Sequence, residues 1–571
     1  MRTFFISVVF TLLCIFSLSA QEKPLKREVT LYNPYKPSLN QSGKINYMPD
    51  MTDTARFRPA FNYNVSATPF MPSYTVSPIK AAVLQPDPLD KLYKSYVKIG
   101  LGNYFSPLAT LSITNERSKK GAIGFYGNHY SNNGNIKLAN GRKIFAGYMD
   151  NDLSLFGRRF FKSSVIGGSI DYLQKTRHAY GYDPEILNFV PGKKDTRLGY
   201  GDIGATLSLS STRADSSRFA YQFSLGYDYF YDNQDFSRNR LKFNGEMAKL
   251  YKGFFAGSGL EFVHFNSVDN PRGNISSSDY IFALKPFVKK STSQWQFRVG
   301  LQAVLEKYIE EDAKVHLYPD LGFGFSIVPS YLGFFSSLTG YLEQNDQTKT
   351  IEENPFILPK GDLYLIPNTD HKLVVKAGFR GNTGLDGTYE LSASYSLIDN
   401  MIFFSNLLSN DTIYGRGNYF LPYSDDVDVL NIHGGMNGRF SNKLTFDGRL
   451  NFYKYNLTST DFPINRPEWD VSLDLKYNLR DKIIASLGVT ALGSRTNMVT
   501  RFQGDLPGAI STVSYLDEPW HLNLNLGAEY RYSKILSFWM KFNNLSAQRY
   551  NEWAFYPTHR YLFMLGFTYS L

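Results

Sequence analysis

The sequence predicts an all-β chain: a transmembrane, antiparallel, up-and-down β-barrel of about 22 strands (range about 18–24), preceded by an extended N-terminal tail. Three observations predict it. Apolar and polar residues alternate with a period of two in segment after segment, and short polar turns alternate with longer connections. Aromatic residues make up 16% of the chain, with 41 Tyr and 45 Phe. Such side chains favour the boundary between an apolar layer and water.

Residues 1–20 have the pattern of a secretory signal peptide, which we expect to be cleaved after Ala20. Arg2 supplies the positive charge, and an apolar stretch runs from Phe4 to Phe16. This stretch is shorter than the ~20 residues of a membrane-spanning helix. No longer apolar run follows, which excludes a helical membrane protein. Cys14 is the only cysteine, so the mature chain has no thiol for disulfides or metal sites.

Residues 21–92 are rich in proline and show no stable period, which predicts an extended periplasmic tail without a core of its own. Within it, "REVTLY" contains a segment that resembles the short box through which energised receptors engage the TonB protein. That segment is Glu28, Val29, Thr30 and Leu31.

Residues 93–571 carry the period-two signal and are predicted to form the barrel. In 444–453, 469–479 and 520–531, large apolar residues alternate with polar ones, so each strand has one lipid-like and one polar face. We expect the polar faces to line the lumen, through Asp447, Arg449, Asp470, Asp474, Lys476, Glu529 and Arg531.

The connections between these segments differ in length on the two sides of the predicted sheet. Short polar turns are expected at 211–216, 290–293, 328–330, 441–442, 480–481 and 533–534, and long loops at 344–369, 409–425 and 494–516. Short turns on one side and long loops on the other are typical of outer-membrane barrels. Counting back from Leu571 gives about ten short turns and about eleven outer loops, which places both termini in the periplasm.

The final segment, 561–571, is predicted to be the last barrel strand. We expect it to pair with 535–542 on one side and with the first strand, 93–101, on the other, so that closure removes an exposed edge. It is also suited to recognition by the machinery that inserts barrels, through strand pairing. Its lipid-facing residues are expected to be Tyr561, Phe563, Leu565, Phe567, Tyr569 and Leu571.

The segment "FNNLSAQRYNEWAFYPTHRYLFMLGFTYSL" resembles the end of TonB-dependent receptor barrels. The residues that carry the resemblance are Asn544-Leu545, Tyr550, Trp553, Tyr556-Pro557 and Arg560. "NPFILPKGD", "LVVKAGFRG" and "YELSASYSLIDNMIFF" resemble mid-barrel segments of the same receptors, and "YVKIGLGNYFSPLATLSI" is similar to barrels of the Bacteroidota type. The resemblance implies a Gram-negative outer-membrane barrel. These receptors carry a globular plug where this chain has only the tail, so a plug-less relative is expected.

The expected function is that of a solute pore or transport component in contact with outer-membrane lipid. Two alternatives stay open: a non-conducting subunit of an envelope assembly complex that engages periplasmic or outer-membrane protein partners through its tail, and a lipid hydrolase. The net charge of +10 is spread along the chain without a basic run, which argues against nucleic acid as a partner.

The hydrolase alternative depends on "GNHYSNNG", where His129 and Ser131 share one strand face. A histidine base beside a serine nucleophile suits acyl transfer, and the string resembles the histidine-x-serine-asparagine motif of outer-membrane phospholipase A. We nevertheless expect no enzyme, no cofactor and no metal. The eight histidines are scattered, and Asp425, Asp426 and Asp428 are expected in a solvated acidic outer loop.

Overall fold

The computed structural model describes residues 93–571, with gaps at 116–117, 183–191, 213–218, 234, 270–274, 309–311, 358–366, 385, 410–418 and 504–509. The predicted signal peptide and the tail 21–92, with the TonB-box-like segment, lie outside the described residues. No helix of the described part is long and apolar enough to cross a membrane.

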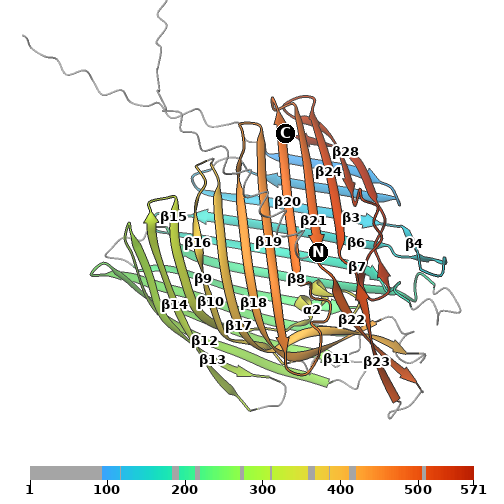
Figure 1. The fold of residues 1–571 in the computed structure, drawn as a ribbon. Coiled ribbons are helices and arrows are strands. Elements are labelled where there is room, and N and C mark those ends of the chain that lie inside the picture. The colour runs from blue at the N-terminus through green and yellow to red at the C-terminus, as the bar shows by residue number, and fades with distance from the viewer. Residues whose placement is uncertain are drawn as a thin grey trace, which may run out of the picture. The chain divides into compact units, whose positions relative to one another are not determined.

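The described chain is a closed antiparallel β-barrel (Figure 1). Twenty-two strands of its 24-stranded main sheet form the ring. In chain order they are β1 (Ser95–Gly102), β2 (Ser106–Thr114), β3 (Gly121–Asn132), β6 (Tyr148–Phe160), β7 (Ser164–His178), β8 (Arg197–Ser211), β9 (Ala220–Asp232), β10 (Phe236–Tyr251), β11 (Phe254–Asp269), β12 (Ile275–Ser291), β13 (Trp295–Lys307), β14 (Lys314–Val328), β15 (Leu332–Glu343), β16 (Thr369–Asn382), β17 (Thr388–Ser409), β18 (Tyr419–Arg439), β19 (Leu444–Leu457), β20 (Trp469–Leu479), β21 (Ile483–Leu492), β24 (His521–Arg531), β25 (Leu536–Asn543) and β28 (Leu562–Ser570).

The remaining elements lie in the connections at one end of the ring. They are the hairpins β4 (Asn135–Lys137) with β5 (Lys143–Phe145), β22 (Arg495–Gln503) with β23 (Ile510–Glu518), and β26 (Asn551–Trp553) with β27 (Tyr556–Pro557), and the helix α2 (Gln347–Glu353). Figure 1 shows β22 and β23 projecting at this end of the strands.

The pairing of the last strand is confirmed. β28 pairs with β25 on one side, Phe567 opposite Phe538, and with β1 on the other, Phe567 opposite Ile99. Leu565 is 52% and Phe567 38% exposed, so the odd-numbered residues face outward. On the inner face Gly566 lies directly opposite Gly100, and the ring of Trp539 covers both glycines.

The predicted difference between the two ends is also present. The turn between β20 and β21 is tight because Arg480 and Asp481 both adopt positive φ, at 53° and 55°, the conformation that matches the twist of a hairpin. The side chain of Asn478 accepts a hydrogen bond from the Asp481 amide at 2.9 Å. The long connections gather at the other end, here called the long-loop end.

Two of the loop predictions need correction. The segment 494–516 is not a plain loop, since it contains the hairpin of β22 and β23. β18 begins at Tyr419, so Asp425, Asp426 and Asp428 belong to a strand and not to an outer acidic loop. Asp425 is buried and accepts hydrogen bonds from Ser459 and Thr460, which satisfy its carboxylate and fix the β19–β20 connection.

The inner face of the closing seam leaves no room for a side chain at residue 566. A Cβ there would lie 2.0 Å from the Ile99 carbonyl oxygen, whereas a Cβ on Gly434 would meet nothing within 4 Å. We expect Gly566→Ala to cost about 1–3 kcal/mol through overpacking. The temperature at which half of the barrel unfolds, measured by heat-modifiable migration on gels, should fall for Gly566→Ala and stay unchanged for Gly434→Ala. Equal midpoints would contradict this account of the seam.

Candidate functional site at the long-loop end of the barrel

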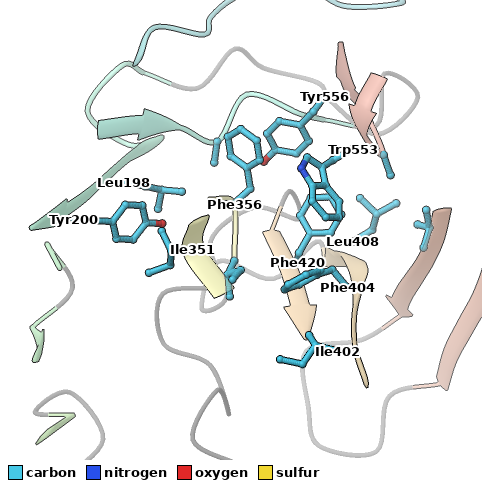
Figure 2. Packing of buried hydrophobic residues seen from close by; sticks show 14 of the residues in the cluster. Leu198, Tyr200, Ile351, Phe356, Ile402, Phe404, Leu408, Phe420, Trp553 and Tyr556 are labelled. Carbon is cyan, nitrogen blue, oxygen red and sulfur yellow. The ribbon is translucent and has the colours of Figure 1, made fainter. Parts of the chain in front are cut away.

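At the long-loop end of the barrel, side chains from segments far apart in the sequence pack together. Sixteen buried residues form one hydrophobic cluster, here called the mouth cluster (Figure 2). It comprises Ala179, Leu198, Tyr200, Phe230, Phe236, Ile351, Phe356, Ile357, Ile402, Phe404, Leu408, Phe420, Val499, Trp553, Ala554 and Tyr556. Helix α2, the ends of β17 and β18, and the β26–β27 connection therefore pack against β8 and β9 across the ring.

Aromatic rings form the centre of the mouth cluster. The ring of Phe356 stacks on that of Tyr556 with centroids 3.9 Å apart, and Trp553 meets Phe420 edge-on at 5.3 Å (Figure 2). Tyr556 is 0% exposed. Gly181 allows this approach, because a Cβ there would lie 2.1 Å from the Tyr556 ring. Buried aromatic pairs add about 0.5–1.5 kcal/mol each beyond their burial.

Polar anchors hold α2 at the wall of the barrel. Arg238 and Arg240 of β10 each bind both Asp228 of β9 and Asp346, the N-cap of α2. The shortest contacts join Arg240 Nη1 to Asp346 Oδ2 at 2.6 Å and Arg240 Nε to Asp228 Oδ1 at 2.7 Å. Arg238 is 1% exposed and also donates to Thr348 at 2.8 Å. We call these four charged residues the arginine clasp.

The electrostatics of the arginine clasp favour the ionised form of Asp346. Burial opposes ionisation of this carboxyl, but the guanidinium groups of Arg238 and Arg240 outweigh burial and hold its pKa below the ordinary value. The Asp346 carboxylate also accepts a hydrogen bond from the Lys349 amide at 2.9 Å, which caps the helix. At the other end of α2, Glu353 forms an ion pair with Arg466 at 2.5 Å.

A second strand pairing joins a barrel strand to a loop hairpin at the same end. The end of β17 pairs in parallel with β22, with Ser405 opposite Met498 and Leu408 opposite Arg501. Ser405 and Thr500 share a hydrogen bond between their hydroxyls at 2.8 Å. Sequence reasoning missed this hairpin, although "RTNMVTRFQ" and "ISTVSYLDE" are rich in β-branched residues and flank the turn-like "GDLPG", which is the usual hairpin signal.

The residues predicted to line the lumen lie on β19, β20 and β24, away from the mouth cluster. Asp447 stands directly opposite Asp474, and its carboxylate pairs with Arg449 of the same strand at 3.1 Å. Asn451 donates to Asp470 at 3.0 Å. Lys476 lies opposite Thr445 in the register, and Arg531 pairs with Glu529 at 3.4 Å. The structure thus brings together the residues of β19 and β20, and separately the pair on β24.

The comparisons with known proteins concern the fold. No known protein family and no curated protein matches the sequence. Among solved structures, the siderophore receptor PirA from Acinetobacter baumannii is 11% identical, with a TM-score of 0.63 over 85% of this chain and 81% of that one. The ferric-catecholate import receptor Fiu from K12 E. coli is 10% identical, with a TM-score of 0.59 over 84% of this chain and 82% of that one. The copper transporter OprC is 11% identical, with a TM-score of 0.60 over 85% of this chain and 82% of that one.

At these identities the likeness establishes the fold. These similar structures are receptors and transporters and not enzymes, an inference at the level of the fold. The chain therefore has the 22-strand barrel fold of TonB-dependent outer-membrane receptors.

Loss of one arginine should release α2. Arg238→Ala takes one of two arginine partners from each of the carboxylates of Asp228 and Asp346, and breaking a buried ion pair costs about 3–5 kcal/mol. A spin label at Glu352→Cys, where the only native cysteine is Cys14, should then become mobile. Arg449→Ala is the matched control, because exposed pairs contribute no more than about 1 kcal/mol. An equally immobile label in both variants would contradict the role of the arginine clasp.

Acid should release α2 as well. The two arginines hold the pKa of Asp346 in the folded protein below its ordinary value, so its ion pairs hold α2 in place above that ordinary value and are lost as the pH falls through the folded pKa. Mobility of the same label should stay constant from pH 7 to pH 5 and rise below about pH 3.8. In Asp346→Asn the label should be mobile at neutral pH already. A release midpoint near neutral pH in the unmodified chain would refute this assignment.

Proposed function

We propose that this chain is an integral outer-membrane barrel of a Gram-negative bacterium, with periplasmic termini, that acts as a gated component of solute transport. The observation that carries the proposal is the mouth cluster with its arginine clasp. A barrel of about 22 strands encloses a lumen that is normally plugged. Here the chain's own segments pack together at the long-loop end, and in the proposed gate passage of a solute requires that α2 leave its site.

Two further observations support this proposal. Large apolar side chains face outward around the ring, among them Ile123 at 61%, Leu207 at 58% and Leu391 at 57% exposed, as contact with lipid requires. Structures with the same fold include an import receptor and a copper transporter.

The charges of β19 and β20 are proposed to set the ion preference of the lumen. Asp447 and Asp474 are neighbours across two strands, and the side chain of Arg449 is 63% exposed. Charged rings along a pore select ions by sign. The same argument extends to Asp470, Lys476, Glu529 and Arg531.

Conductance in planar bilayers tests the gate. In the proposed gate the mouth cluster and the arginine clasp hold α2 in place, so the full mature chain should give only rare openings, whereas Arg238→Ala should give frequent openings. Within the Arg238→Ala background, Asp474→Lys should shift the reversal potential in a salt gradient toward anion preference. A large and permanently open conductance in the unmodified chain would overturn the gate.

A second function is favoured by the same closure, namely that of a non-conducting barrel in an envelope assembly complex. In this case residues 21–92, including Glu28 to Leu31, bind periplasmic partners by strand addition. Two results together would favour this function over transport. No variant, including one without residues 21–92, would conduct in bilayers, and envelope proteins would co-purify in stoichiometric amounts only when residues 21–92 are present. The final strand, Tyr561 to Leu571, is proposed to engage the barrel-insertion machinery in either case.

A further inference from the structure

A row of polar side chains crosses the outward face of the barrel near the long-loop end. His129 of β3 lies opposite Asn151 of β6, and Asn151 lies opposite Gln174 of β7. Strand residues an even number apart share a face. His129 therefore faces the same side as Ile123, which is 61% exposed, and Gln174 the same side as Ile170, which is 58% exposed. The row thus points away from the lumen and toward the side where lipid would lie.

These side chains form one directed chain of hydrogen bonds that includes Ser131. Asn151 Nδ2 donates to Gln174 Oε1 at 2.9 Å, which leaves Asn151 Oδ1 facing His129 Nδ1 at 2.6 Å. An amide oxygen only accepts, so the proton of the imidazole sits on Nδ1. His129 Nε2 then carries the lone pair and accepts from Ser131 Oγ, 3.3 Å away. This is the tautomer that a general base requires.

The surroundings match a lipid substrate. Toward the middle of the same outward face lies an apolar groove of about 590 Å³, lined by Leu155 and Ile170, which lie opposite each other, and by the small residues Gly157, Gly168 and Ala205. Leu155 is four residues from Asn151 along β6, or about 13 Å at the rise of a strand. Ser131 is the last residue but one of β3 before the long connection. The row therefore lies at the rim of the apolar surface, where the ester groups of a lipid would meet it.

We propose that Ser131 and His129 are the catalytic residues of a membrane-facing acyl hydrolase site, with Asn151 and Gln174 as positioning residues and an ester-linked acyl chain of a membrane lipid as substrate. The acyl chain lies in the groove lined by Leu155 and Ile170. Ser131 is 8% exposed, so the lipid must first displace its neighbours; its cross-strand partner Met149 is unbranched and can rotate away.

The reaction proceeds in two balanced steps. Ser131 Oγ bonds to the ester carbonyl carbon while its proton passes to His129 Nε2; the ester C–O bond breaks, and the departing alkoxide takes that proton and leaves as an alcohol. Water then attacks the acyl-serine and gives a proton to His129 Nε2. The fatty acid leaves, and the proton returns to Ser131. Asn151 accepts from Nδ1–H throughout and takes no proton.

The test uses the full mature chain in vesicles of phosphatidylethanolamine and, in a second arm, in vesicles that contain lipid A, since both carry ester-linked acyl chains. Fatty acid release is measured by mass spectrometry, and a fluorophosphonate probe reports on the serine itself. Ser131→Ala should abolish both signals. His129→Ala should lower the rate of release by about 10²–10⁴-fold. Release in one arm alone identifies which lipid is the source of the acyl chain.

The chain offers a matched control. His433 Nδ1 contacts Asn451 Oδ1 at 2.7 Å in the same manner, but on the opposite face, because its neighbour Ile432 is 45% exposed. His433→Ala should therefore leave acyl release and probe labelling unchanged.

The positioning role of Asn151 has its own readout. A carboxylate in Asn151→Asp favours the imidazolium form of His129, so the acid limb of the pH–rate profile should move to higher pH. A purely structural residue would not move it. Probe labelling no higher in the unmodified chain than in Ser131→Ala, with no acyl release from either vesicle and with folding confirmed by gel migration, would overturn the proposal.

Discussion

Closure of the ring is the constraint on which the rest of the structure depends. In a membrane every backbone donor and acceptor must find a partner within the protein, and a barrel provides this only when its first and last strands meet. Here β1 and β28 meet along seven consecutive register pairs, from Tyr96 with Ser570 to Gly102 with Met564. At this seam Gly100 and Gly566 leave the space that the ring of Trp539 and the neighbouring backbone occupy.

The closed ring encloses a wide lumen, and the long loops have to bury their apolar side chains at its end. A wide lumen would expose the apolar rings of Phe356, Trp553 and Tyr556 to water, and packing them together across the mouth removes them from it. The arginine clasp adds little net stability, because desolvation of buried charges offsets their attraction. Its effect is positional, since Arg238 and Arg240 accept α2 in one place only.

The sequence predicts the strands well because their period depends only on neighbouring residues. The alternation in 469–479 and 561–571, the tight turn at 480–481 and the pairing of the last strand all follow from local pattern and from the need to remove an edge. The outer loops obey no such period. The burial of Asp425 and the hairpin of β22 and β23 arise from contacts at the long-loop end.

The candidate sites likewise contain residues that a local sequence pattern predicts and residues that only contacts between distant segments bring in. His129 and Ser131 share a face because they are two residues apart, which the sequence reveals directly. Asn151 completes their hydrogen bonding only because β6 follows β3 in register across an intervening connection, and no local signal marks it. The pairing of Arg238 with Asp346 could not be predicted from the sequence, since it joins a strand to the N-cap of a helix more than 100 residues away in the chain.

The arginine clasp also determines how the mouth can open. Each arginine binds both carboxylates, so removal of α2 takes one partner from Arg238 and one from Arg240 at the same moment. The four charges therefore behave as one cooperative unit, and substitutions of the two arginines should be non-additive. In the gating that we propose, opening is accordingly expected to be an all-or-none transition. Any ligand or partner that opens the mouth must supply the whole free-energy difference through its greater affinity for the open form.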